Sequence, residues 1–463
     1  MAPMQHKMVR DPVQLQEFHS SGRCMGLVCG KKVYLEGAIP GETVTYTLGR
    51  RNQGFRAGRV EEILHPSPFR VRPFCKHVDT CGGCPWQHMD YRGQLRYKRE
   101  ILCNALAKYG ISTPEVPQVV PSPENRFYRH RMEYAFAENA WHQQDSMTVR
   151  KRGIGFHMAG DPGNVFAVEE CFLQAEPSRS ICAFIENYPT LHEMDMFHTE
   201  SQEGLVRSLS IRVNLSGDTM VTLGMAGTMT EPVHRMLHAL QSAFPCIVSL
   251  NYTSHLSRAH SQMQGEIQPF DNSSVYLHER IGDLCFRIHA SSFFQPNVRQ
   301  AEAIFKTVCD WARLTGTERV YDLYTGVGTL ALFLARSAAR VTGIEGSAQA
   351  ISDARENALR NGISNTEFLV GDILETFRPS FVETHGIPDL IVLDPPRSGT
   401  LIEIKKTINT SGANKVIYLS CNPVSLAFDL KQLTEAYQVT RILPFDMLPQ
   451  THHLETLVLL EKK

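Results

Sequence analysis

The period of hydrophobic and polar positions changes along the chain and divides it into three parts. Residues 20–65 hold short β-rich runs between turn signals such as Pro40-Gly41 and Asn52-Gln53-Gly54. About five short strands in such a span predict a small barrel of the OB type. Residues 66–92 are rich in Pro and Cys and predict irregular backbone, and a helical pattern follows over 93–109. Residues 120–290 mix strand and helix signals and predict an α+β region.

From about residue 298 helical and strand-like patterns alternate. Ala301, Phe305, Val308 and Ala312 predict a helix over Val298–Arg313. Further helices are expected over 330–339 and 348–361, and short apolar strands over 320–324, 341–344, 367–370, 390–393 and 416–419. This alternation predicts an α/β fold with a Rossmann-like, doubly wound parallel sheet whose two faces are covered.

Charge is uneven along the 463 residues, although the net charge is only −1. Residues 1–131 carry 20 Lys and Arg against 11 Asp and Glu, and the remainder is acidic. A basic front favours a polyanion such as nucleic acid, and an unevenly charged solvated surface is the alternative. The predicted barrel carries basic residues and one aromatic residue, as nucleic-acid-binding barrels do: Lys31, Lys32, Arg50, Arg51, Phe55, Arg56 and Arg59. No apolar run predicts a membrane span or a secretory signal, so a cytoplasmic location is expected.

Three acidic or glycine-rich signals follow three successive predicted strands. Residues 322–329, Asp-Leu-Tyr-Thr-Gly-Val-Gly-Thr, form a turn between strand and helix, Glu345 ends the next strand, and Asp372 ends the third. Ligands bind at the carboxyl ends of such sheets, where a carboxylate can accept ribose hydroxyls and another an adenine amino group. The turn lacks the third glycine and any pyrophosphate-specific feature, which favours S-adenosylmethionine over a dinucleotide.

Two motifs follow the fourth and fifth predicted strands. Residues 394–399 read Asp-Pro-Pro-Arg-Ser-Gly, and residues 420–423 read Ser-Cys-Asn-Pro. The second presents Cys421 where a helix is expected to begin, and a helix N-terminus favours the thiolate form. A buried, inert cysteine is the alternative. Two further polar segments lie at 293–297, Phe-Phe-Gln-Pro-Asn, and at 451–455, Thr-His-His-Leu-Glu.

Together these four motifs resemble the bacterial RNA 5-methyluridine methyltransferases, over nearly the whole chain. The resemblance implies a TRAM-type OB-like RNA-binding barrel over 1–66, a cysteine-rich domain over 67–292 and a catalytic domain over 293–463, against which 94–124 could pack. The 23S rRNA branch of the family is the best match, because it carries both the TRAM region and the cysteine cluster. A role in rRNA processing and a monomeric enzyme are therefore expected.

The resemblance assigns roles to individual residues. Cys421 is the expected nucleophile and Glu455 the general base. Phe293 and Asp394 are expected to bind uracil, and the expected S-adenosylmethionine ligands are Gln295, Tyr324, Glu345, Asp372 and Asp394. C5 of uracil is a poor nucleophile until a thiolate adds to C6, and a base must then remove the C5 proton so that the thiol can leave. The uridine must be unstacked to be reached.

The 12 cysteines include a compact cluster, Cys75, Cys81 and Cys84. Four cysteines can hold zinc or an iron–sulfur cluster, and the spacing does not decide between them. The family resemblance implies Cys171 as the fourth ligand, with Cys103 as competitor, and a [4Fe–4S] cluster. A structural or RNA-orienting role is expected for that cluster, with redox sensing as the alternative.

Other functions remain open at the level of sequence. A tRNA or dual-target uridine-C5 enzyme would share all these residues. An amino-group methyltransferase would share Asp394-Pro395-Pro396 but would need neither Cys421 nor Glu455. A protein of another class, a non-catalytic iron–sulfur RNA-binding or redox-sensing protein, would bind RNA without turnover.

Overall fold

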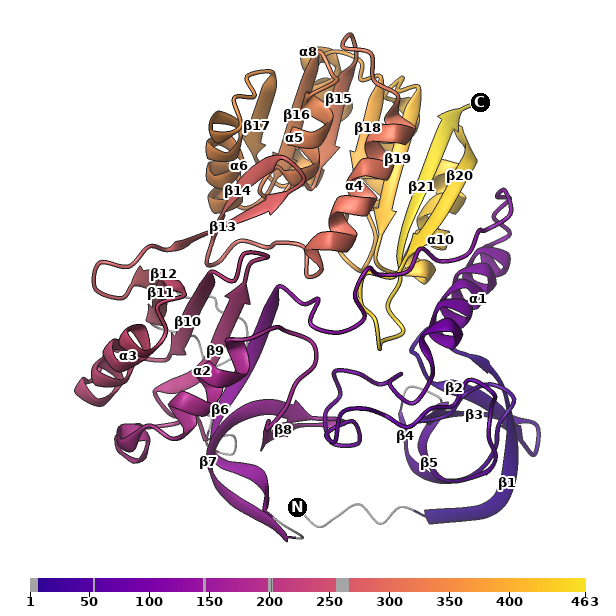
Figure 1. Cartoon of the computed structure of the whole chain (residues 1–463). Coiled ribbons are helices and arrows are strands. Elements are labelled where there is room, and N and C mark those ends of the chain that lie inside the picture. The colour runs from indigo at the N-terminus through magenta and orange to yellow at the C-terminus, as the bar shows by residue number, and fades with distance from the viewer. Residues whose placement is uncertain (1–6, 53–54, 145–146, 199–200, 202, 255–265) are drawn as a thin grey trace.

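A computed structural model describes residues 7–52, 55–144, 147–198, 201, 203–254 and 266–463. Figure 1 shows three parts: a barrel at the lower right, a sheet at the lower left and a larger sheet with helices at the top. Among the described residues, no helix is both long and apolar enough to cross a membrane.

The first part is a closed five-stranded barrel. Its strands are β1 (Lys7–Phe18), β2 (Cys24–Val28), β3 (Lys31–Glu36), β4 (Thr43–Asn52) and β5 (Phe55–His65), in the order β1-β2-β3-β5-β4. Leu35, Val44 and Tyr46 are fully buried in it, which confirms the predicted small barrel. Lys31, Lys32 and Arg59 are exposed. The side chains of Arg50, Arg51, Phe55 and Arg56 lie outside the part that the structure describes.

An irregular segment follows the barrel and leads into helix α1 (Tyr91–Tyr109). Asp90 begins the helix by accepting the backbone N–H of Gly93 at 2.7 Å, and Gly110 ends it with φ 65°. Such caps satisfy the backbone groups left unpaired at helix ends. Leu102 and Leu106 of α1 are buried in the same hydrophobic core as the helices of the C-terminal sheet. Helix α1 therefore packs on that sheet, although it is distant in sequence.

The central part is a mixed seven-stranded sheet in the order β12-β11-β10-β9-β6-β7-β8. Its elements are β6 (Arg131–Gln144), β7 (Met147–Met158), β8 (Asp161–Ala167), α2 (Ser178–Glu186), η1 (Pro189–Glu193), β9 (Val206–Val213), β10 (Thr219–Met225), α3 (Glu231–Ala243), β11 (Ile247–Ser254) and β12 (Glu266–Pro269). The apolar sides of α2 and α3 pack on the sheet in one hydrophobic core. The hairpin β13 (Tyr276–Ile281) and β14 (Leu284–His289) instead contributes Phe286 and Ile288 to the core of the C-terminal sheet.

The C-terminal part is a seven-stranded sheet in the order β17-β16-β15-β18-β19-β21-β20. Its strands are β15 (Arg319–Leu323), β16 (Arg340–Glu345), β17 (Thr366–Val370), β18 (Leu390–Leu393), β19 (Lys415–Ser420), β20 (Tyr437–Phe445) and β21 (Glu455–Lys462). Its helices are α4 (Val298–Ala312), α5 (Thr329–Ala335), α6 (Ala348–Arg360), α7 (Ile373–Thr376), α8 (Pro379–His385), α9 (Ile402–Thr410) and α10 (Pro423–Leu433). The first five strands of the order are parallel, and β21 is antiparallel to both its neighbours.

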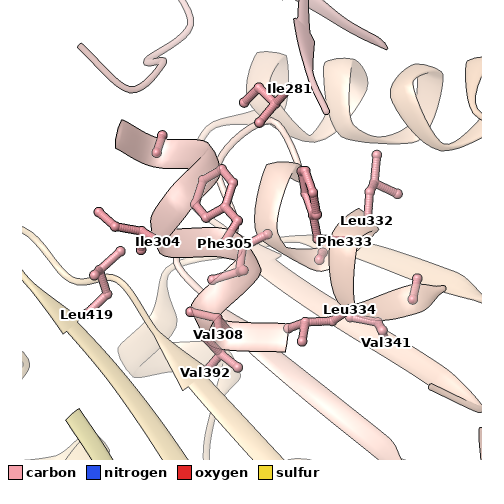
Figure 2. Close-up of a cluster of buried hydrophobic side chains, with 14 of the residues drawn as sticks. Ile281, Ile304, Phe305, Val308, Leu332, Phe333, Leu334, Val341, Val392 and Leu419 are labelled. Atoms are coloured by element: carbon pink, nitrogen blue, oxygen red, sulfur yellow. The ribbon is translucent and has the colours of Figure 1, made fainter. Parts of the chain in front are cut away.

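Hydrophobic cores cover both faces of this sheet. Helices α4, α5 and α6 pack on one face, and α1, α9 and α10 pack on the other. Figure 2 shows Phe305 of α4 and Phe333 of α5 within the first core, with Val392 and Leu419 of the sheet nearby. The Rossmann-like α/β prediction is therefore confirmed. Helix α5 ends at Ala335, earlier than the expected residue 339, because Ala339 already bonds Glu318 before β16.

Candidate functional site

The carboxyl edge of the C-terminal sheet gathers most of the predicted site residues. In the register of the parallel strands, Leu323 pairs with Ile344 and Leu393, and Leu393 pairs with Tyr418. The residues that follow these strand ends therefore stand side by side. They include the predicted Tyr324, Glu345, Asp394 and Cys421. This edge, where strand order reverses between β15 and β18, is the usual ligand position in open α/β sheets.

Strand β21 brings the second predicted catalytic residue to the same edge. It runs antiparallel to β19, and Thr456 pairs with Ser420. Cys421 and Glu455 are the next residues outward on the two strands, so their backbones are neighbours although 34 positions separate them in the chain. Glu455 is 7% exposed, and Cys421 is half-buried. The two side chains are close enough for the charge of Glu455 to act on the Cys421 thiol.

The ionisation of Cys421 departs from the expectation of a favoured thiolate. Asn422 is the N-cap of α10 and accepts the backbone N–H of Val424 at 3.1 Å, so Cys421 lies one residue before the cap. Burial, followed by the negative charges of Glu455 and Asp394, raises the pKa of Cys421 to about 12, against the opposing effect of Arg397. The helix N-terminus was expected to favour the thiolate, whereas burial and the two carboxyl groups act in the opposite direction on this pKa.

The two carboxyl groups beside the thiol also favour their neutral forms. Burial, and then the charge of Asp322, raises the pKa of Asp394 to about 7. Burial, and then the charge of Asp394, raises the pKa of Glu455 well above its usual range. Glu455 Oε1 is buried and has no hydrogen-bond partner among the described residues. Carboxyl groups with such raised pKa values, side by side at strand ends, are typical of sites that move protons.

The predicted cofactor ligands surround the glycine turn after β15. Glu345 accepts the backbone N–H groups of Gly326 at 3.3 Å and of Ser347 at 2.9 Å. Gly326 has φ 57°, and nothing lies within 4 Å of where a side chain would begin. Tyr324 also has a positive φ, 67°, and its hydroxyl is 3.0 Å from Thr400 Oγ1. An oriented carboxylate beside open backbone fits the ribose of a nucleoside.

Asp372 lies farther along this edge, after β17, and is exposed. Its Oδ1 accepts the backbone N–H groups of Leu374 at 2.8 Å and Glu375 at 3.3 Å, as the N-cap of α7. One oxygen of the predicted adenine ligand is therefore already used in holding the strand-to-helix turn.

The segment 293–297 divides its residues between two environments. Gln295 Nε2 donates to Asp394 Oδ2 at 3.3 Å, which ties this segment to the reactive edge. Phe293 is 66% exposed and lines a separate cavity on the other side, together with Pro296. Asn297 begins α4 by accepting the backbone N–H of Gln300 at 3.1 Å.

Residues 446–454 connect β20 to Glu455 and form hydrogen bonds with helix α1 and with the irregular segment that precedes it. Lys98 of α1 donates to Asp446 at 2.5 Å and to the carbonyl of Leu448 at 3.1 Å, and both charged side chains are fully buried. The amide of Gln94 exchanges two hydrogen bonds of 2.9 Å with Gln450. The backbone N–H of Trp86 donates to the carbonyl of Gln450 at 3.0 Å. Helix α1 and the cysteine-bearing segment thus position the residues that lead into Glu455.

Two residues near the reactive edge were missed by sequence reasoning. Arg397 contacts His453 Nδ1 at 3.0 Å, and its carbonyl accepts from Asn422 at 2.9 Å and from Ser425. It lies within the recognised 394–399 motif, so its charge was the available signal. Asp322 is buried under the glycine turn, where it accepts from Thr325 Oγ1 at 2.6 Å.

The four predicted metal ligands line one cavity of about 830 Å³. Cys75, Cys81, Cys84 and Cys171 all face it, whereas Cys103 packs with the core beneath α1. Backbone N–H groups approach two of the sulfurs, His77 toward Cys75 and Gly83 toward Cys81, each at 3.4 Å. Across the described chain, no three His, Cys, Asp or Glu side chains are grouped closely enough for one metal ion. The predicted metal centre is therefore not confirmed.

Comparisons with known proteins show to which family the chain belongs. A family model described as tRNA (Uracil-5-)-methyltransferase matches residues 90–463. The chain belongs to this family. Proteins called uncharacterized RNA methyltransferases from Porphyromonas gingivalis and Bacteroides thetaiotaomicron are 35% and 33% identical to it. These matches cover 97% and 96% of this chain and 99% of each relative.

A crystal structure of a similar protein has the same overall fold. The Pyrococcus abyssi tRNA (uracil-54, C5)-methyltransferase, in complex with S-adenosyl-L-homocysteine, has a TM-score of 0.77 and 26% identity, over 97% of this chain and 100% of that chain. This chain is therefore, as a member of the tRNA (uracil-5-)-methyltransferase family, an RNA methyltransferase that uses S-adenosylmethionine. Family membership favours the enzymatic prediction over a non-catalytic RNA-binding or redox-sensing protein.

Proposed function

We propose that this protein transfers a methyl group to C5 of a uridine in 23S rRNA through a covalent bond between Cys421 and C6 of the base. The observation that carries the proposal is the pairing of Ser420 with Thr456, which supports a shared space for Cys421 and Glu455. An amino-group methyltransferase needs neither residue at that place.

In the proposed reaction, Cys421 gives its thiol proton to water, its Sγ adds to C6, and the π electron pair of the C5–C6 bond moves toward O4. C5 then forms a bond to the methyl carbon, and the electron pair of the broken sulfur–methyl bond stays on the sulfur of the methyl donor. Asp394 and Phe293 hold the uracil, and Gln295 orients Asp394 through its hydrogen bond. Glu455 then takes the C5 proton, the C5–C6 double bond re-forms and the thiolate leaves. The raised pKa of Glu455 makes it a competent proton acceptor once its carboxylate is formed.

S-adenosylmethionine, when bound, supplies the electrophilic methyl group. We propose that Tyr324, Glu345, Asp372, Gln295 and Asp394 hold it at the glycine turn. The open space over Gly326 and the two backbone bonds that orient Glu345 support this assignment.

The covalent step is tested with RNA that carries 5-fluorouridine, in which fluorine replaces the proton that Glu455 must remove. We expect the protein and S-adenosylmethionine to form an adduct that survives denaturing electrophoresis. Cys421→Ala should form none, and Cys103→Ala, which removes a thiol outside the site, should behave as the unchanged protein. Normal uridine methylation by Cys421→Ala would overturn the mechanism.

The RNA target has two candidates. The barrel and the cysteine-rich segment suggested the 23S rRNA branch. The tRNA enzyme of Pyrococcus abyssi matches 97% of this chain, however, so those two regions also accompany a tRNA target in that protein. Mapping 5-methyluridine in 23S rRNA and tRNA from a strain that lacks this protein decides between them, and loss from both would indicate a dual-target enzyme.

We further propose that Cys75, Cys81, Cys84 and Cys171 hold a [4Fe–4S] cluster. The convergence of four sulfurs on one cavity and the two N–H groups directed at sulfur support it. Each cysteine of such a cluster binds a different iron, so the sulfurs stand farther apart than around one zinc ion.

The cluster is tested by iron and labile-sulfide analysis of protein purified without oxygen. We expect about four of each per chain, which is the composition of this cluster type. Cys75→Ser should lose both, whereas Cys103→Ser should keep them. Zinc in place of iron would contradict the proposal.

Three further assignments are proposed at the level of the whole chain. The first is a division of the chain at residues 66 and 292 into a TRAM-type RNA-binding barrel, a central cluster-binding domain and a catalytic domain. The second is that the enzyme is a monomer. The third is a cytoplasmic location.

A further inference from the structure

The rim of the cysteine cavity carries a group of aromatic side chains beside one arginine. Arg126 lies over the ring of Phe74, with its guanidinium carbon 3.7 Å from the ring centre. Phe74 contacts Phe172 edge-on at 5.1 Å between ring centres, and Phe172 contacts Phe127 at 5.8 Å. We call Phe74, Arg126, Phe127 and Phe172 the aromatic platform.

Phe127 is the exposed ring of the platform, and Arg126 beside it is also exposed. Its side chain is 49% exposed, and its backbone has φ 54°. A bulky residue in the left-handed region is strained, and such strain persists where the surrounding structure imposes it. Here the backbone N–H of Phe127 donates to the carbonyl of Phe172 at 2.7 Å, while the next residue, Tyr128, is buried and donates to the carbonyl of Pro449 at 3.0 Å. The chain thus turns an aromatic ring toward solvent while its neighbours are fixed.

The lining of the cavity beside the platform holds three arginines and two glutamates, Glu133 and Glu170. Arg129, Arg131 and Arg212 line it, and Arg131 is paired with Glu133. Arg212 is 1% exposed and donates to the carbonyl of Ser292, but among the described residues its Nη1 has no partner. A guanidinium group with an unpaired nitrogen, on a residue that lines a cavity, favours an anion as ligand.

The platform is connected to the reactive edge through residues 293–296. Phe293, Phe74 and Phe172 line the same cavity, and Gln295 reaches Asp394 from the other side of that segment. Residues 293–296 therefore contact both the cavity beside the platform and Asp394 of the reactive edge. Exposed rings with arginines are what single-stranded nucleic acid binds, through base stacking and phosphate contacts.

We propose that the aromatic platform stacks an unpaired nucleobase of the RNA near the target uridine, with Arg129 and Arg212 facing its phosphodiester. The inference rests on the proposed function, because it assumes that the bound macromolecule is RNA. In this proposal the cysteines also contribute to RNA binding, because they position two rings of the platform. Phe74 precedes Cys75 and Phe172 follows Cys171, so the group that joins these cysteines also holds the two inner rings of the platform together.

The test uses a single-stranded oligoribonucleotide with one uridine and 2-aminopurine at a flanking position, varied along the strand. Binding to the full-length protein is measured by fluorescence anisotropy, and stacking by quenching of 2-aminopurine. Phe127→Ala should weaken binding about tenfold, within the roughly 5- to 150-fold range that loss of one stacked base produces, and should abolish quenching at one position. Phe127→Trp should retain both.

Controls separate stacking from damage to the fold. Phe428 on α10 is also 49% exposed, so Phe428→Ala removes an equally exposed ring elsewhere and should bind as the unchanged protein. Phe127→Asn places a residue that tolerates a positive φ at the strained position, so it should fold at least as well and still lose quenching. Equal affinity and quenching in Phe127→Ala, Phe127→Asn and the unchanged protein would overturn the proposal.

Adduct formation with 5-fluorouridine RNA distinguishes the two proposals. If the unchanged protein forms the adduct but Phe127→Ala binds normally, the platform is refuted and the methylation mechanism stands. If no adduct forms but Phe127→Ala loses affinity and quenching, the platform stands and the mechanism falls.

Discussion

At the scale of single residues, the candidate site is a group of buried side chains whose protonated forms are favoured. Cys421, Glu455 and Asp394 all have a raised pKa, first because each is buried and then because of nearby carboxylates, which in the case of Asp394 is Asp322. The protein without RNA therefore favours a protonated thiol. In the proposed mechanism, the thiolate of Cys421 therefore forms only when the uracil binds. The bound uracil excludes water and accepts the negative charge of the thiolate.

Replacing the proposed base should stop the reaction after methylation. In Glu455→Gln the thiol can still add to C6, but nothing removes the C5 proton, so turnover should fall by about 10²- to 10⁴-fold. We expect a covalent protein–RNA species to accumulate with ordinary uridine RNA and S-adenosylmethionine, measured on a denaturing gel. Cys421→Ala/Glu455→Gln should form none, and a freely turning-over Glu455→Gln enzyme would contradict the role.

Asp322 gives a prediction for stability against pH. Burial raises the pKa of Asp322 from 3.8 to about 7, so the folded state binds the proton more tightly than the unfolded state. The contribution to stability is present in full below pH 4 and is lost as pH rises through about 7. Because one pH unit of displaced pKa corresponds to ~1.4 kcal/mol, the loss should be on the order of 4 kcal/mol.

Asp322→Asn cannot ionise and should lack this loss. Thermal unfolding of the two proteins between pH 4 and 8 should therefore show a difference that grows in favour of the variant up to about pH 7. Asp283→Asn, at an exposed position, serves as the control. Parallel curves for Asp322→Asn and the unchanged protein would refute the prediction.

At the scale of elements, α1 matters because it fixes the residues that lead into Glu455. The buried pair Lys98–Asp446 joins α1 to the segment after β20. Lys98→Met would leave Asp446 buried without its cation, which costs about 3–5 kcal/mol. We expect a lower unfolding temperature and lower methylation activity, measured on the same preparations.

The double variant Lys98→Met/Asp446→Leu is the matched control for that loss. It removes both charges, and an apolar pair of similar volume is often neutral relative to a buried ion pair. Stability should largely return in the double variant. If it falls further than in Lys98→Met, the ion pair is not the cause.

At the scale of the whole molecule, the barrel, the irregular segment after it and helix α1 all contact residues 446–454, the segment that leads into Glu455. The barrel reaches it through Gly22, whose carbonyl accepts from Trp86 Nε1 at 2.9 Å and whose backbone leaves no room for a side chain beside His452. The cysteine-bearing segment reaches it through Trp86, and α1 through Gln94. The proposed RNA-binding barrel and the reactive edge are thus joined by direct contacts.

The basic barrel should govern the salt dependence of RNA binding. Lys31 and Lys32 are exposed on β3. Each phosphate contact on single-stranded nucleic acid contributes ~0.7 to the slope of log K against log salt concentration. Lys31→Glu/Lys32→Glu should reduce that slope by up to about 1.4, measured by titration at several salt concentrations. Lys406→Glu, exposed on α9, should leave it unchanged, and an unaltered slope in the barrel variant would exclude its two lysines as phosphate contacts.

The order of elements and the contents of the reactive edge were predictable from sequence. Short apolar strands alternated with helices, and parallel strands of one sheet end at the same edge. The residues after β15, β16, β18 and β19 could therefore be grouped without a structure. Glu455 was different, because only resemblance connected it to Cys421. Its position depends on β21 inserting antiparallel between β19 and β20, which no local period encodes.

By itself, the sequence predicted the candidate site residues and the strand ends that present most of them, because side-chain type and local periodicity act over a few residues. Only the tertiary structure decided the ionisation of Cys421, the hold of α1 on residues 446–450 and the exposure of Phe127. Each of these depends on burial and on charges brought from distant parts of the chain. The helix N-terminus near Cys421 was visible in the sequence, but the two carboxyl groups that outweigh it meet the thiol only in the folded protein.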